Sequence, residues 1–229
     1  MPSEFNRIHY EEVTSTNDVC KEEHKKSSTI TVITADKQTQ GRGRSNKAWA
    51  SPKGNVSFSF GFTSSGLIDG LSVKAGLTVA KTISKSLRRP VQLKWPNDLI
   101  FESKKVGGIL VEAENVEEKF ILVIGIGINF SIVPKEGHWG DLNIDNYELK
   151  EKFISELIKN LLKDIVDDPS PDWHREWNEY CVHLNQEVEL ENNEAYVFKG
   201  VNNLGRMIGE KSSQTYEISE SSLKVKGLY

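Results

Sequence analysis

Three stretches of apolar residues constrain the fold of this chain more than any other feature. In residues 56–62, bulky apolar side chains alternate with Ser or Gly, which is the period of a half-buried strand. The apolar runs 107–114 and 120–128 are separated by a short polar stretch, so we expect an antiparallel pair of strands. A β-sheet with this pair at its centre is therefore predicted.

Two long amphipathic helices are predicted over residues 71–87 and 149–165. Apolar residues recur there at helical spacing, for example at Leu71, Ala75, Val79, Ile83 and Leu87. The pattern Ser15-Thr16-Asn17-Asp18 is a capping box that opens a shorter helix to about Lys26. Further strands are expected at 7–13, 29–35, 91–95 and 99–102. These patterns predict an α/β domain in which helices and a β-sheet pack together.

The spacing of apolar residues and turns changes after about residue 185. Four short strand-like pieces, at 187–191, 195–201, 206–210 and 215–218, follow one another between turns rich in Asn, Gly and Ser. Such closely spaced strands predict a small β-barrel. We therefore expect two domains, residues 1–184 and residues 185–229.

Charge, cysteine content and hydropathy exclude several classes of protein. Acidic residues outnumber basic ones, 33 to 29, for a net charge of −4, which disfavours general nucleic-acid binding. Two cysteines imply no disulfide framework. No apolar run approaches the ~20 residues that span a bilayer, and residues 1–7 contain no apolar signal region. We expect a cytoplasmic protein without a membrane partner.

Residues 41–55 form the segment richest in chemical groups, with three glycines and four cationic residues between two predicted strands. Backbone N–H groups of such a loop can turn toward an anion, and arginine offers a planar pair of donors to phosphate or carboxylate. Trp49 adds a flat face for a base or ring. Taken alone, the segment is equally compatible with a basic surface loop. It matches neither the dinucleotide-binding fingerprint nor a P-loop.

Three further clusters carry polar or glycine residues at strand ends. In residues 94–98 (Lys-Trp-Pro-Asn-Asp), Pro96 forces a turn that presents Asn97 and Asp98, although an ordinary Asn-Asp turn would look similar. Lys105 shortly precedes two glycines, either at a strand mouth or at a solvated hairpin tip. Residues 125–129 (Gly-Ile-Gly-Ile-Asn) predict a strand approached closely by a ligand or another backbone.

These four clusters, in this order and with Ser15-Thr16-Asn17 ahead of them, closely resemble the motifs of biotin protein ligases. Gln38, three residues before Gly-Arg-Gly-Arg at 41–44, also matches. The motifs span residues 15–129. The resemblance implies an α+β fold: a catalytic domain with a mixed sheet and helices, similar to class II aminoacyl-tRNA synthetases and lipoate ligases, followed by a small SH3-like β-barrel.

The resemblance implies a two-step reaction. Biotin and ATP, with Mg²⁺, first give biotinoyl-5′-AMP and pyrophosphate, and a lysine of a biotin carboxyl carrier protein then takes the biotinyl group and releases AMP. Carboxylate and phosphate repel each other, so such a site needs fixed cations. By this resemblance the catalytic residues are Arg44 and Lys105, which contact both anions, and Asp98, which accepts a hydrogen bond from the incoming amine.

The resemblance also implies two sets of binding residues and no assigned Mg²⁺ ligand. Those for biotin are Ser15, Thr16, Asn17, Gln38, Gly41, Arg42, Gly43, Arg44, Trp49, Lys105, Gly107 and Gly108. Those for the nucleotide are Arg44, Lys47, Trp49, Asn97, Lys105 and Asn129. The loop 41–55 is expected to be mobile without ligands and to close over them.

The sequence departs from the family pattern at Asn46, where the loop usually has a third glycine. At the next position, Lys47 keeps the positive charge but lacks the planar pair of donors that an arginine would offer. Some relatives double as repressors through an N-terminal helix-turn-helix. No room for one precedes Ser15, so we expect no DNA binding. A homodimer is plausible by analogy with the family.

Two other functions remain open at this stage. A lipoate–protein ligase would share the architecture, but the arginine-glycine loop and the Lys-Trp-Pro-Asn-Asp string resemble the biotin branch. A biotin or nucleotide sensor without turnover is the second alternative, and the presence of Arg44 and Lys105 argues against it.

Overall fold

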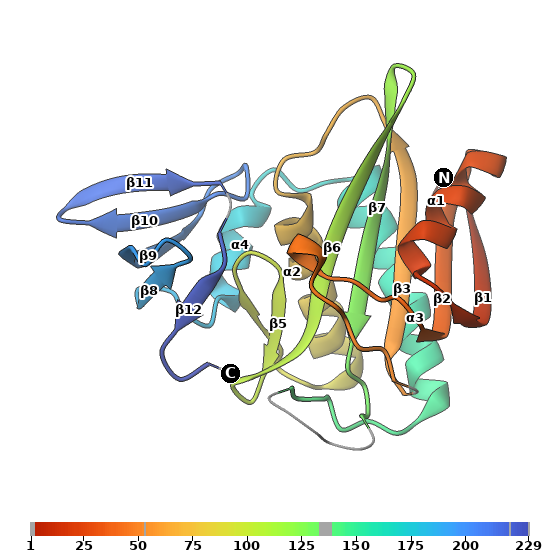
Figure 1. Ribbon diagram of the computed structural model, residues 1–229, viewed down its shortest axis with the longest axis horizontal. Helices are drawn as coiled ribbons and strands as arrows, with labels where there is room; N and C mark the ends of the chain where they lie inside the picture. Colours follow the sequence, from red (N-terminus) through yellow and green to blue (C-terminus); the bar gives the residue numbers. More distant parts are fainter. Residues whose placement is uncertain (1–2, 53, 133–138, 220, 229) are drawn as a thin grey trace.

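The computed structural model describes residues 3–52, 54–132, 139–219 and 221–228 (Figure 1). Within these ranges, seven strands form one mixed sheet in the order β1-β2-β3-β7-β6-β5-β4, in which only β1 and β2 run parallel. The strands are β1 (Phe5–Val13), β2 (Ile30–Gln38), β3 (Val56–Ser64), β4 (Gln92–Lys94), β5 (Asp98–Phe101), β6 (Lys104–Val116) and β7 (Lys119–Ile128). The predicted α+β class with a mixed sheet is confirmed, as is the central antiparallel pair, β6 and β7.

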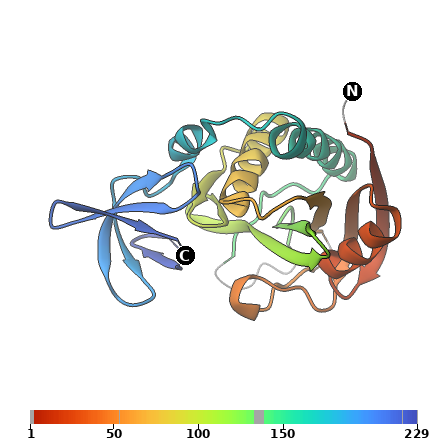
Figure 2. The ribbon, with the colours of Figure 1, turned by 90° about the horizontal axis from the view of Figure 1, so that it is seen from above.

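The two faces of the sheet are covered by different layers, as Figure 2 shows. The helices α2 (Leu71–Leu87) and α3 (Tyr147–Leu161) pack on one face, and α1 (Thr16–Ser27) and the loop after β2 lie on the other. The even-numbered residues 56–62 of β3 point into the large core beneath α2 and α3. On the neighbouring β7, odd-numbered residues such as Ile121 and Val123 point to the other face of the sheet. They pack in a smaller core with Cys20 of α1. The period of two therefore assigns each side chain to a layer.

A second, five-stranded sheet follows the short helix α4 (Trp173–Tyr180) and lies at the end of the molecule opposite β1 (Figure 1). Its order is β11-β10-β9-β8-β12. The strands are β8 (Glu187–Leu190), β9 (Ala195–Val201), β10 (Met207–Lys211), β11 (Gln214–Ile218) and β12 (Leu223–Val225). Four match the sequence prediction, and β12 was missed because three residues show no usable periodicity.

Two buried contacts join this sheet to the rest of the molecule. The indole Nε1 of Trp95 donates to the carbonyl of Gly205 at 2.9 Å, and Trp95 itself is buried. The ring of Trp177 on α4 lies 6.2 Å from that of Phe198 on β9. The two sheets therefore share one continuous apolar core.

Two local predictions need correction. The helix α1 begins at the expected place, but the side chain of Ser15 makes no capping hydrogen bond. The long helix predicted over 149–165 divides into α3 and a wider π-type turn over Leu162–Asp167. Among the described residues, no helix combines the length and the apolar character needed to cross a membrane.

The fold predicts a large stability cost for truncation of the aromatic side chain at the centre of α3. Phe153 is fully buried and packs against Phe130, so Phe153→Ala should lower the free energy of unfolding by about 3–5 kcal/mol. The matched control is Tyr147→Ala on the same helix, where the side chain is 72 % exposed and the expected change is within about 0.5 kcal/mol. Urea unfolding measures both. Equal midpoints for the two variants would contradict this packing.

Candidate functional site

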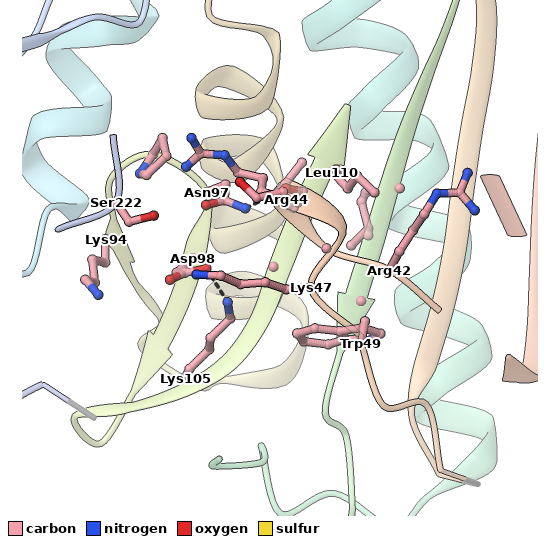
Figure 3. A pocket seen from close by; sticks show the side chains of 18 of the residues that line it. Arg42, Arg44, Lys47, Trp49, Lys94, Asn97, Asp98, Lys105, Leu110 and Ser222 are labelled. Carbon is pink, nitrogen blue, oxygen red and sulfur yellow. Dashed lines mark hydrogen bonds and ion pairs between the residues drawn. The ribbon is translucent and has the colours of Figure 1, made fainter. Parts of the chain in front are cut away.

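One pocket of about 630 Å³ lies between the loop after β2, the adjoining face of β6 and β7, the β4–β5 turn and the C-terminal strand β12 (Figure 3). Most residues that the sequence analysis proposed line this pocket, and their contacts with ligands stay a prediction. The lining residues from that set are Ser15, Thr16, Asn17, Gln38, Arg42, Gly43, Arg44, Lys47, Trp49, Asn97, Asp98, Lys105, Gly108 and Asn129. Gly41 and Gly107 are not in the wall: a Cβ at Gly107 would point at the Leu99 side chain.

Two glycines of β7 make room for the pocket. A Cβ at Gly125 would collide with the side-chain amide of Asn17, and one at Gly127 would lie 2.6 Å from the indole of Trp49. Both glycines lie on the face of β7 that is covered by α1 and the loop. Nearer the start of the strand, Ile121 and Val123 occupy the same face and pack against α1. Their missing side chains therefore allow Asn17 and Trp49 to lie directly on the sheet.

The polar end of the pocket is a hydrogen-bonded network. Gln38 Oε1 accepts from the backbone N–H of Thr16 at 2.9 Å and from its hydroxyl at 3.0 Å, and Gln38 Nε2 donates to Ser51 Oγ at 2.9 Å. Ser59 of β3 contacts both Thr16 Oγ1, at 2.8 Å, and Asn17 Oδ1, at 2.6 Å. Thr16 and Asn17 are nearly fully buried, so their orientation is determined before a ligand arrives.

Arg42, at the start of the loop, is held by two carboxylates. Its guanidinium donates two hydrogen bonds to Asp18 of α1, at 2.6 and 2.7 Å, and two to Glu112 of β6, both at 3.0 Å. These bonds to Arg42 hold the pKa of the Asp18 carboxyl below its usual value. In Figure 3 the guanidinium of Arg42 points away from Lys105. Its side chain is therefore engaged in protein contacts.

The opposite end of the pocket carries cations around one carboxylate. Lys105 Nζ forms an ion pair with Asp98 Oδ1 at 2.5 Å and lies 5.7 Å from the ring centre of Trp49. Lys94 is buried beside this pair, and burial lowers its pKa, with Lys105 lowering it further and Asp98 opposing both. Figure 3 shows Lys47 extending toward the same cluster. An excess of positive charge in a partly buried pocket favours anionic ligands.

The loop between these two ends is folded on itself. The backbone N–H of Trp49 donates to the carbonyl of Gly41 at 2.9 Å, and the backbone N–H of Gly43 donates to the carbonyl of Lys47 at 2.7 Å. The tight turn within it has its left-handed residue at Ser45, with a φ of 52°, so the departure from glycine at position 46 does not prevent a turn. Lys53 lies outside the described residues.

Asn97 and Asn129 hold neighbouring backbone in place. Asn97 Nδ2 donates to the carbonyl of Ile109 at 2.9 Å. Asn129 Nδ2 donates to the carbonyl of Gly140, and its Oδ1 accepts from Asn55, both at 2.9 Å. Asn55 is itself the end of the loop, so Asn129 anchors that end to β7.

Sequence reasoning missed two parts of the wall. Trp139 is 53 % exposed at the rim and follows a segment with no periodic pattern. The C-terminal strand contributes several residues, and Arg44 Nη1 donates to the carbonyl of Ser221 just before it, at 3.2 Å. These residues are Ser222, Leu223, Lys224, Val225 and Leu228. No local signal marks them, because their role depends on where the second sheet docks.

Comparisons with known proteins identify the family to which the chain belongs. The sequence profile of the Biotin/lipoate A/B protein ligase family matches residues 10–129. The chain is 34 % identical over 116 residues to the "Bifunctional ligase/repressor BirA" of Bacillus subtilis, which is 46 % of this chain and 34 % of that protein. It has the same identity over 116 residues to the "Biotin--[acetyl-CoA-carboxylase] ligase" of Mycobacterium tuberculosis, which is 46 % of this chain and 41 % of that protein. The chain therefore spans less than half the length of these two relatives.

A solved structure is similar over nearly the whole chain. The biotin protein ligase of Aquifex aeolicus in complex with biotin and ATP superposes with a TM-score of 0.76 at 28 % identity, covering 96 % of this chain and 98 % of that one. The family profile matches just over half of the 229 residues. This chain belongs to the biotin/lipoate A/B protein ligase family.

Proposed function

We propose that the protein is a biotin protein ligase, which uses ATP to attach biotin to a lysine of a biotin carboxyl carrier protein through biotinoyl-5′-AMP. One observation carries the proposal: a single pocket has a hydrogen-bonding network at one end and a cluster of cations at the other. A neutral polar ring system and two anions need this division. The Aquifex aeolicus relative, whose structure was solved with biotin and ATP, supports it.

In the proposed first step, a biotin carboxylate oxygen attacks the α-phosphorus of ATP, and pyrophosphate leaves. Arg44 and Lys105 would neutralise the two repelling anions, with Lys47 and Lys94 adding positive charge nearby. Trp49 would cover the ligand and exclude water from the reactive anhydride. Thr16, Asn17 and Gln38 would bind the biotin ring system, with Ser15 and the backbone of the loop around it.

In the proposed second step, the carrier lysine attacks the carbonyl carbon of the adenylate, and AMP leaves. The ion pair between Lys105 and Asp98 supports a role for Asp98 here. When a phosphate oxygen competes for Lys105, the carboxylate of Asp98 would be free to accept a hydrogen bond from the incoming amine and orient it for attack. Asn97 and Asn129 would shape the nucleotide side of the pocket.

Magnesium is part of the proposal as the ion that accompanies ATP. The described residues contain no group of three or more His, Cys, Asp or Glu side chains that could hold a metal. Phosphate oxygens and water would therefore supply most ligands of the ion, which is usual for Mg²⁺ bound with a nucleotide. Its charge would weaken the repulsion between the phosphates and biotin.

Five structural and cellular expectations also stay proposals. The second sheet would form an SH3-like domain over residues 185–229, after a class II synthetase-like catalytic domain over 1–184. Its short antiparallel strands and tight turns support this assignment. A cytoplasmic location, the absence of DNA binding and a homodimer complete the proposal.

Biotin-dependent exchange of pyrophosphate into ATP tests the proposed function against its alternatives. A biotin ligase exchanges with biotin, a lipoate ligase with lipoate, and a sensor with neither. The full reaction is tested by incubating a carrier domain with the protein, biotin and Mg-ATP. We expect a mass increase of one biotinyl group, and an unmodified carrier together with no exchange would contradict the proposal.

Removal of the central cation should abolish adenylation without unfolding the protein. Lys105→Ala is expected to slow biotin-dependent exchange by about 100-fold or more, because one charged donor to the transition state is lost. The control is Lys104→Ala, the exposed neighbour on the same strand, which should exchange at nearly the normal rate. Circular dichroism checks folding. A folded Lys105→Ala protein with normal exchange would remove this residue from the mechanism.

Ligands should protect the loop from protease. Trypsin can cleave after Arg44 and Lys47, and biotin plus ATP should slow cleavage there by about tenfold or more, because opening must then disrupt ligand contacts. Cleavage after Lys211, at the tip of the β10–β11 hairpin, is the internal control and should not change. Mass spectrometry of timed digests measures both. Equal loop cleavage with and without ligands would argue against closure.

A further inference from the structure

Glu112 of β6 connects the polar end of the pocket to the loop. One carboxylate oxygen, Oε2, accepts from Asn17 Nδ2 at 2.9 Å and from Arg42 Nη2 at 3.0 Å. The other, Oε1, accepts from Arg42 Nε at 3.0 Å. Glu112 is not itself in the pocket wall. We propose that Glu112 is a positioning residue for biotin, acting through Asn17 and Arg42; this inference rests on the proposed function.

On the pocket side, Glu112 determines which way the amide of Asn17 faces. A carboxylate only accepts hydrogen bonds, so the group of Asn17 that faces it must be the NH₂. The amide oxygen of Asn17 then accepts from Ser59 at 2.6 Å. Gly125 beneath it has no side chain, and a Cβ there would collide with this amide. Loss of the charge on Glu112 would allow this amide to rotate away from its binding orientation.

On the loop side, Glu112 and Asp18 together hold Arg42. Asp18 belongs to α1 and Glu112 to β6, so the guanidinium bridges two elements that are themselves packed on the sheet. Charged bonds with paired donors are the strong class of hydrogen bond. Arg42 is the second residue of the loop, so this bridge fixes the point from which the loop extends over the pocket.

The charges around this bridge balance locally. Lys21 of α1 lies 3.2 Å from Asp18 and 3.6 Å from Glu112, so two carboxylates face one arginine and one lysine. Two residues farther along β6, Glu114 pairs with Lys25 of α1 at 2.9 Å. Glu114 therefore makes the same kind of contact between the same two elements, but no hydrogen bond or ion pair links it to Asn17 or to the described residues of the loop. It is the matched control.

The test compares Glu112→Gln with Glu114→Gln. Glutamine keeps the shape of the side chain, but its NH₂ group opposes a donor of Arg42 or Asn17. Loss of one charged hydrogen bond corresponds to about a tenfold change in equilibrium. For Glu112→Gln we expect the KM for biotin in pyrophosphate exchange to rise about tenfold, with kcat within about twofold. We also expect trypsin to cleave the ligand-free protein after Arg42 about tenfold faster.

Glu114→Gln should change neither quantity, and both variants should melt within a few degrees of the unmodified protein. Should Glu112→Gln not fold, Asp18→Asn removes the other half of the bridge and should accelerate cleavage after Arg42 in the same way.

The outcomes separate this inference from the proposed function. Equal behaviour of the two glutamine variants, or faster cleavage without a rise in KM, would overturn the positioning role of Glu112. A fall in kcat at constant KM would overturn it too, because positioning acts on biotin binding. Absence of biotin-dependent exchange in the unmodified protein would overturn the proposed function instead. Faster cleavage of Glu112→Gln would then still support anchoring of the loop by Glu112.

Discussion

Steric contact between the bare backbone of β7 and the groups that lie on it determines the geometry of the pocket. Gly125 receives the amide of Asn17 and Gly127 the ring of Trp49, at distances that no Cβ atom would tolerate. The same strand carries Ile121 and Val123 on that face where α1 packs in the ordinary way. One face of the sheet is thus closely packed at one end and open to a pocket at the other. The polar network and the loop lie where the glycines leave space for them.

Charge distribution is the second constraint, and it differs between the two ends of the pocket. At the biotin end proposed here, the guanidinium of Arg42 is neutralised by Asp18 and Glu112. At the other end, Asp98 faces two lysines, Lys94 and Lys105, one of them buried. Placing lysines together in partly desolvated surroundings is costly, and an anionic ligand relieves that cost. The protein therefore holds its positive charge where a phosphate would need it before a ligand arrives.

Much of this fold follows from local patterns. Alternating apolar residues at 56–62 predicted β3, and apolar residues at every fourth position of 71–87 predicted α2. The two apolar runs at 107–114 and 120–128 predicted β6 and β7. Burial on one side imposes such a period on the chain. The pocket also follows in large part from sequence, since its glycines, cations and amides stand in short motifs at strand ends. The hydrogen bonds that connect one motif to another, such as Gln38 to Thr16 and Asn55 to Asn129, do not, because their partners lie far apart in the sequence.

Residue types and their spacing were sufficient to predict the central strands of the sheet, the helix on its face and the glycine-rich loop as a candidate anion site. Long-range packing assigned the rest. Ser221 meets Arg44 across 177 positions of the sequence, and Glu112 meets Arg42 across 70. Such pairs depend on the docking of one sheet against another and on the distance between neighbouring strands. A local pattern contains neither quantity, because both arise only once the whole core has packed.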